Sequence, residues 1–413
     1  MLYSQPSIPS PRDRRLDVLR GLCLLDMVLV HLLEQNVRAP WLLGEAAMHW
    51  FRFAAGGFVL TSGLCIGAIH YTRALDPARR TRTHVSLLKR AGYVLAVHLF
   101  ASILTLILIP IHGQPVYNVS AMLRDVLTLH AGYDLLLFYV FMLLISPLVI
   151  ELLRRVGPAW VLLTSVAVFF WNYDDPYLHL WAIEKDFPLI RWQLIFVTGL
   201  VLGSKLKAYD ALPTPAKWRL LGVAVATGLG IDILSAAERA GLISLPWYLA
   251  VTKLPLSPLE VLRYVSFAVA AGVTLDRFWH RLGNTTTQRV LAAVGVQSLM
   301  LWVVHVPIVA NVAPLPWPVA LLLAWVGVWL AAVIATRLTK LWADTLPVLP
   351  RLSYLVPAVG SVAVCVILTR LEIPRTTELP LAASIVTDES VFFDDDDNAL
   401  PIPVDDDSIL ETA

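Results

Sequence analysis

The sequence has little charge for its length and few cysteines. Charged residues make up 15% of its 413 residues, whereas 57% are hydrophobic. Soluble domains carry more charge and fewer unbroken apolar runs, so the composition predicts an integral membrane protein. The three cysteines lie in apolar segments without metal-ligand spacing and predict neither a disulfide nor a zinc site: Cys23, Cys65 and Cys365.

Several other signals are missing as well. The chain has no basic patch typical of nucleic-acid binding, no glycine-rich phosphate loop, no zinc motif and no serine-elbow motif. No internal repeat stands out. The N-terminal arm lacks a small-residue cleavage site, so a removable signal peptide is not expected. These absences indicate a single membrane domain without a fused soluble domain.

What the sequence has instead is a series of long apolar runs. Runs of about 17 to 25 apolar residues bridge a hydrocarbon core of about 30 Å. We therefore predict an all-α polytopic integral membrane helical bundle with 10 or 11 transmembrane helices. The candidate spans lie at residues 16–33, 50–70, 88–110, 132–152, 157–172, 190–206, 218–236, 258–276, 294–312, 318–338 and 352–369.

The loops between these runs indicate the orientation. Basic residues occupy every second loop, as in 73–90 and 205–219, whereas the loop at 173–189 carries acidic residues. Lys and Arg are enriched on the cytoplasmic side, so the N-terminus is predicted to be cytoplasmic. The predicted organisation is a cytoplasmic arm (1–15), a transmembrane domain (16–370) and an acidic, disordered tail (371–413).

Two ionisable residues, Arg20 and His31, lie inside the first apolar run. Ionisable side chains are expensive in a bilayer and usually mark function. Eleven helical steps of about 100° return to within about 20° of the starting direction, which puts both residues on one face, about 16 Å apart along the axis. We predict that they line one path, with Arg20 near the cytoplasmic face and His31 deeper. His305, in a later run, lies at a similar depth.

Each polar position also has a structural interpretation. An intramembrane histidine such as His98 can be a hydrogen-bonded packing residue. Lys89 and Arg90 can be anchors that reach the lipid headgroups. The small residues in 56–63 can form a face for close helix packing. If Lys89 and Arg90 act with Arg20, their cytoplasmic position predicts a site for the phosphates of a ligand, and the depth of Asp134 predicts a place in an outer polar cluster.

The motifs carry a family resemblance. The segment RRLDVLRGLCLLDMVLVHL (14–32) resembles the first span of the acyltransferase-3 superfamily, in which ten residues separate an arginine from a histidine. GGFVLTSGLCIG (56–67) resembles the second-span signature of that superfamily. Within it, the chain is most similar to the OpgC-type membrane glucan succinyltransferases. Further matching segments follow in the family's order, at 87–99, 131–155, 187–203, 253–270 and 294–309.

The resemblance implies an acyltransferase that moves a succinyl or acetyl group from cytoplasmic acyl-CoA to a glycan hydroxyl on the outer side of the bacterial inner membrane. It implies that His31 is the catalytic base and Arg20 its catalytic partner. Acyl-CoA would be the donor, bound at Arg20, Lys89 and Arg90, with no tightly bound cofactor and no metal. The predicted substrate-binding residues are Ser62, Gln193, Arg263, His305 and Asp134.

Two departures and two competing functions accompany this resemblance. Gly56 stands where the family usually has an acidic residue, and Asp26 is an unusual addition to the first span.

A secondary transporter would also hold charges in its spans, with broken helices and inverted repeats. A lipid-linked glycan ligase would need a larger outer loop. The sequence leaves open the acyl group, the glycan, direct transfer against an acyl-enzyme, and the oligomeric state.

Overall fold

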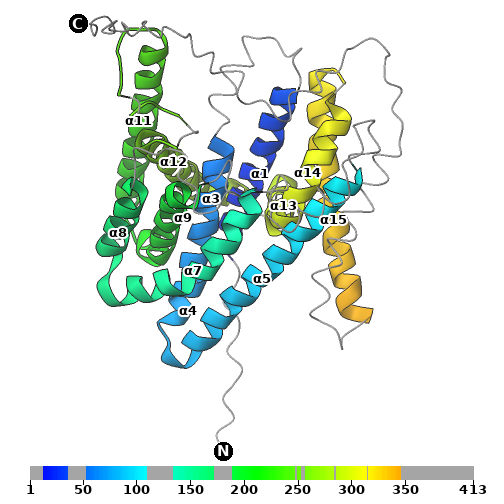
Figure 1. Ribbon diagram of the computed structural model, residues 1–413, viewed down its shortest axis with the longest axis horizontal. Helices are drawn as coiled ribbons and strands as arrows, with labels where there is room; N and C mark the ends of the chain where they lie inside the picture. Colours follow the sequence, from blue (N-terminus) through cyan, green and yellow to red (C-terminus); the bar gives the residue numbers. More distant parts are fainter. Residues whose placement is uncertain are drawn as a thin grey trace, which may run out of the picture. The chain divides into compact units, whose positions relative to one another are not determined.

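The computed structural model describes residues 13–35, 53–108, 134–171, 188–246, 249–252, 256–282, 285–313 and 315–345. These residues form helices joined by turns and contain no strand (Figure 1). The predicted all-α polytopic bundle is confirmed. The helices are α1 (Arg14–Gln35), α3 (Phe53–Ile66), the π-helix η1 (Gly67–Tyr71), α4 (Thr72–Ala74), α5 (Pro77–Leu108), α7 (Asp134–Val156), α8 (Pro158–Phe170), α9 (Leu189–Ser204), α10 (Leu206–Asp210), α11 (Thr214–Arg239), α12 (Pro258–Leu282), α13 (Thr286–Val296), α14 (Ser298–Val312) and α15 (Trp317–Thr345).

The described helices follow the predicted apolar runs from 16–33 to 318–338. Five of them are long and apolar enough to cross a membrane, or up to six if the bent pair α13 and α14 is one span. The first run falls short because Arg20 shares it with Asp17 and Asp26. The run at 352–369 and the acidic tail lie outside the described residues, so the total of ten or eleven spans stays a prediction.

Local sequence signals explain where some helices begin. α5 starts at Pro77 and not at residue 88, because the carboxylate of Asp76 accepts the backbone N–H of Ala78 at 3.0 Å. An aspartate before a proline is a favourable helix start. α8 begins at Pro158 directly after Gly157, whose φ of 87° suits a residue without a side chain.

Two helix pairs pack backbone against backbone through glycines. A Cβ atom on the glycines where α3 and η1 contact α9 would overlap a carbonyl oxygen of the opposite helix: Gly63, Gly67, Gly199 and Gly203. In the same way Gly21 of α1 lies on the carbonyl of Leu291 in α13, and Gly295 of α13 lies on the carbonyl of Asp17. The predicted close-packing face at 56–63 takes part in this contact through Gly63, because small residues let membrane helices approach closely.

The predicted run 294–312 is not one straight helix, and here the sequence-based expectation needs correction. α13 and α14 meet at Gln297 with an angle of 82° between them. Gln297 has φ −95° and ψ 11°, outside the α-helical region. α13 begins earlier than predicted, at Thr286, where the Thr285 hydroxyl accepts the N–H of Gln288. Hydrophobicity alone does not reveal the bend, because residues on both sides are apolar.

α1 lies between two parts of the hydrophobic core. Cys23 and Met27 belong to the larger cluster, which includes residues of α3, α5, α7 and α9. Leu24 and Val28 belong to a second cluster with α13, α14 and α15. Figure 1 shows α1 in dark blue between α3 and α14. Packing on both flanks fixes the rotation of α1, and with it the direction of Arg20 and His31.

Candidate active site

Arg20 and His31 of the first span both contact α14. The guanidinium Nη2 of Arg20 donates a hydrogen bond of 2.6 Å to Ser298 Oγ, at the first residue of α14. The His31 ring lies beside the His305 ring, with the centroids 5.2 Å apart and the planes tilted by 35°. α1 and α14 therefore meet through polar side chains at two levels.

Aromatic side chains connect these two levels. The guanidinium carbon of Arg20 lies over the ring of Phe58 in α3, 5.7 Å from the centroid of that ring. The Phe58 ring stacks on the Trp302 ring, with 6.0 Å between the centroids and 19° between the planes. Trp302 lies 5.2 Å from the His305 ring. We call the five side chains Arg20, Phe58, Trp302, His305 and His31 the polar–aromatic row. It joins three helices whose residues are distant in sequence.

Several polar atoms of this row are buried without a hydrogen-bond partner among the described residues. They are Arg20 Nε, Trp302 Nε1 and His305 Nε2. Buried polar groups in folded proteins nearly always have a partner, and each exception requires an explanation. A bound ligand with polar atoms would supply the missing partners.

The other predicted site residues lie at several places. Ser62 of α3 lies beside the Tyr139 hydroxyl, and Tyr139 packs edge-on against Phe58 at 5.9 Å. Lys89 and Arg90 lie on α5 with exposed side chains. Asp134 is the first residue of α7, and its side chain lies outside the described part.

Gln193 and Arg263 are both engaged by neighbouring side chains. The Gln193 amide oxygen accepts from the Ser165 hydroxyl at 2.6 Å, which joins α9 to α8. Arg263, which is 2% exposed, donates to Asp232 of α11 at 2.6 Å and to Glu260 of its own helix at 3.2 Å. These contacts stabilise helix packing. A substrate-binding role for either residue stays a prediction.

The sequence contained a signal for two further residues of α14, Ser298 and Trp302, which the motifs did not single out beside His305. Ser298, Trp302 and His305 are spaced by four and three residues, which is the spacing of one helical face. Among the described residues, no three His, Cys, Asp or Glu side chains lie close enough together to hold a metal ion.

A comparison with models of known protein families shows to which family the chain belongs. The family model described as OpgC protein matches residues 12–345, a range that contains all the described helices. The chain belongs to the OpgC protein family. No curated protein and no solved structure matches it. Family membership indicates a glucan-modifying acyltransferase, and the apolar helices indicate a multi-pass membrane protein.

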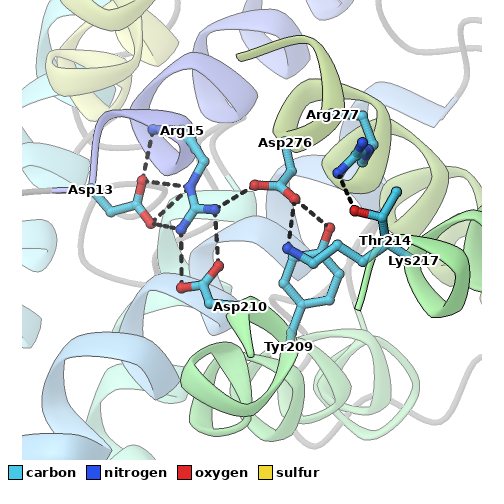
Figure 2. A network of polar contacts seen from close by, with 8 residues as sticks. All are labelled: Asp13, Arg15, Tyr209, Asp210, Thr214, Lys217, Asp276 and Arg277. Atoms are coloured by element: carbon cyan, nitrogen blue, oxygen red, sulfur yellow. Dashed lines mark hydrogen bonds and ion pairs between the residues drawn. The ribbon is translucent and has the colours of Figure 1, made fainter. Parts of the chain in front are cut away.

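A network of charges holds the first turn of α1 in this OpgC family member (Figure 2). Arg15 binds Asp276 of α12 at 2.6 Å and Asp210 of α10 at 2.9 Å. It also binds Asp13, at 2.8 Å, and this hydrogen bond raises the pKa of Arg15 above its usual value. The network fixes the end of α1 that precedes Arg20. The distribution of basic residues along the sequence predicts the topology but does not reveal this network.

Asp276 is the shared acceptor of this network. Its second carboxylate oxygen accepts from Lys217 of α11 at 3.1 Å and from the Tyr209 hydroxyl of α10 at 3.0 Å. Burial, together with the negative charge of Asp276, raises the pKa of Tyr209, so that its phenol remains a donor. Asp276 thereby ties the starts or ends of four helices together.

We predict that Asp276→Asn destabilises the protein by about 2 kcal/mol, because Arg15 and the largely buried Lys217 lose a shared negative partner. The midpoint of thermal unfolding in detergent would fall accordingly. Asp76→Asn is the matched control, because Asp76 pairs with Arg79 where both side chains are exposed, and such pairs contribute less than about 1 kcal/mol. Equal midpoints for the two variants would contradict a stabilising role of the network.

Proposed function

We propose that the protein transfers a succinyl or acetyl group from cytoplasmic acyl-CoA to a glycan hydroxyl on the outer side of the bacterial inner membrane. The observation that carries this proposal is the polar–aromatic row. Three of its polar nitrogens are buried without a partner among the described residues, although Phe58 and Trp302 of the row pack in the hydrophobic core. A reaction centre for a polar substrate explains why such groups are retained there.

The donor is proposed to enter from the cytoplasmic end of the row. The basic loops put the N-terminal end of α1 on the cytoplasmic side, so Arg20 lies nearer to the cytoplasm than His31. Arg20, with Lys89 and Arg90 on the exposed side of α5, offers cations for the phosphates of acyl-CoA. The pantetheine arm would then carry the thioester about 16 Å along α1, the rise from Arg20 to His31.

The chemistry proposed at His31 is general-base catalysis. A ring nitrogen of His31 removes the proton from the sugar hydroxyl while the sugar oxygen attacks the thioester carbonyl. The indole N–H of Trp302, whose ring lies beside that of His305, is available to stabilise the negative charge that develops on the carbonyl oxygen. The carbon–sulfur bond then breaks, and His31 returns its proton to the CoA thiolate. The products are the glycan ester and free CoA.

The acceptor is proposed to reach the row from the outer half of the bundle. Ser62, beside Tyr139 and Phe58, is the predicted substrate residue that belongs to the surroundings of the row. Gln193, Arg263 and Asp134 are proposed to hold sugar hydroxyls farther out. The first two are oriented for that task by Ser165 and by Asp232 with Glu260.

One observation favours a second function, that of a secondary transporter for a small anionic or glycan substrate. Transporters bind substrates at broken helices, and α13 and α14 are broken at Gln297 with an 82° bend. A transporter moves its substrate unchanged, whereas an acyltransferase joins the acyl group to the glycan. The two functions therefore predict different products.

The test is an assay of the full-length protein in lipid vesicles. Succinyl-CoA or acetyl-CoA with a radiolabelled acyl group is supplied on the face that carries the N-terminus, and a glucan oligosaccharide is supplied on the other face. We expect alkali-labile label on the glucan, with the mass of one ester added per modified hydroxyl, and none in protein-free vesicles. Passage of intact acyl-CoA or glucan across the vesicle without ester formation would overturn the proposal in favour of transport.

A further inference from the structure

His305 occupies a position in which its protonation pattern follows from its partners. Its side chain is fully buried on α14, and Nδ1 lies 2.5 Å from the backbone carbonyl oxygen of Trp302. A carbonyl oxygen only accepts hydrogen bonds, so Nδ1 must carry a proton. In a neutral imidazole the other nitrogen, Nε2, then holds the lone pair and can only accept.

That accepting nitrogen is unused within the described chain. His305 Nε2 is buried without a hydrogen-bond partner among the described residues, while the ring of His31 lies 5.2 Å away, centroid to centroid. A buried acceptor without a partner costs free energy. A residue that served only to pack would be replaced by an apolar side chain of similar size at no such cost.

We propose that His305 is a positioning residue for His31: its Nε2 accepts the ring N–H of His31 in the substrate complex. This inference rests on the proposed function. Hydrogen bonds between catalytic groups are often long without substrate and shorten in the complex. The hydrogen bond fixes one tautomer of His31 and turns its other nitrogen, with the lone pair, toward the sugar hydroxyl. The tautomer of a histidine is generally set by the partner of its second nitrogen.

The arrangement also accounts for the proton during the reaction. When His31 takes the proton of the hydroxyl it carries two N–H groups, and one of them stays bound to His305 Nε2. The other gives its proton to the CoA sulfur as the carbon–sulfur bond breaks. His305 accepts a hydrogen bond throughout but takes up no proton, so it remains neutral in the membrane interior.

Replacing His305 by asparagine or by glutamine distinguishes the positioning role from a packing role. Asparagine reaches the position of Nδ1 and can keep the hydrogen bond to the Trp302 carbonyl, but it has no atom at the position of Nε2. Glutamine reaches the position of Nε2 with an oxygen that accepts, but it loses the bond to Trp302. The proposal requires the Nε2 acceptor, whereas a packing role requires the Nδ1 donor.

The experiment compares His305→Gln and His305→Asn in the vesicle assay. We expect H305Q to keep kcat within about tenfold of the wild type and H305N to lose about 100-fold, the upper range for groups that orient a functional histidine. KM for the acyl-CoA should not change in either variant. His98→Gln and His98→Asn are the controls, because His98 is another fully buried histidine, on α5, and its two variants should have equal kcat.

Each outcome of this comparison decides between the roles. Equal kcat for H305Q and H305N, or a higher kcat for H305N, would overturn the positioning role. An inactive wild type would instead overturn the proposed function. If neither variant folds, ¹⁵N-histidine NMR of the wild type in lipid nanodiscs replaces the kinetics. The proposal requires a His305 protonated on Nδ1 and unprotonated on Nε2, together with one tautomer of His31, and a His305 protonated on Nε2 would overturn it.

Discussion

Replacing His31 by alanine should lower the rate of acyl transfer by about 10³-fold, within the range that a general base contributes. The reason is specific to the chemical step. The sugar hydroxyl loses the group that removes its proton, while the donor still meets Arg20 and the exposed cations of α5. The loss should therefore appear in kcat, and KM for acyl-CoA should change little. The vesicle assay with labelled donor measures both constants.

His84→Ala is the control for this substitution. His84 lies on α5 and is partly exposed, as His31 is, so both variants remove an imidazole of similar burial. Detergent-solubilised H31A should elute as a single folded species, and cells carrying H31A at wild-type membrane levels should lack the glycan ester. If H31A modifies the glycan at half the wild-type rate or faster, His31 is not the general base of the reaction.

The sequence predicted the helical class and the position of most helices because a bilayer imposes strict rules. A span needs about 20 apolar residues, and its backbone groups must bond within the helix. Runs such as 132–152 and 258–276 therefore correspond to α7 and α12 with small shifts at the ends. The apolar runs do not predict helix starts that are set by N-cap residues, such as the start of α5 at Asp76 and Pro77, because the first turn of such a helix is polar and lies outside the run.

The bend between α13 and α14 and the partners of the polar residues could not be predicted in this way. The bend at Gln297 depends on where α13 meets α1, which is a tertiary contact. The same holds for Arg263, which the family resemblance predicts to be a substrate-binding residue. Its carboxylate partners, Asp232 and Glu260, become neighbours only when α11 packs on α12. The periodicity of one helix predicts which residues share a face, but not what that face meets.

Arg20 and His31 show both what helical spacing can predict and what it cannot. Their spacing predicted a common face, and both residues contact α14. The partners on α14 have their own helical spacing, but nothing in either segment indicates that the two helices adjoin. Their approach depends on Gly21 and Gly295, which bring α13 against α1 directly before α14 begins. Small residues are common throughout membrane helices, so their pairing is visible only in the folded chain.

Gly295→Ala should therefore destabilise the protein by at least about 3 kcal/mol, at the upper end of the cost of overpacking. The added Cβ would overlap the carbonyl oxygen of Asp17 and crowd the backbone nitrogen of Gly21. Both are backbone atoms that cannot turn away, so α13 and α1 must separate. Separation would also draw Ser298 away from Arg20 and lower the rate of acyl transfer. The measurements are the midpoint of unfolding in detergent and the vesicle assay.

The control is Gly222→Ala in α11, where an added Cβ would meet nothing within 4 Å. In a helix with open space the same substitution is stabilising by up to about 1 kcal/mol, because alanine restricts the unfolded chain and favours the helix. The two glycine variants should thus move the midpoint in opposite directions. Equal midpoints, with wild-type activity in both, would mean that α1 and α13 can separate at no cost, and Gly21 and Gly295 would then not determine where Arg20 meets α14.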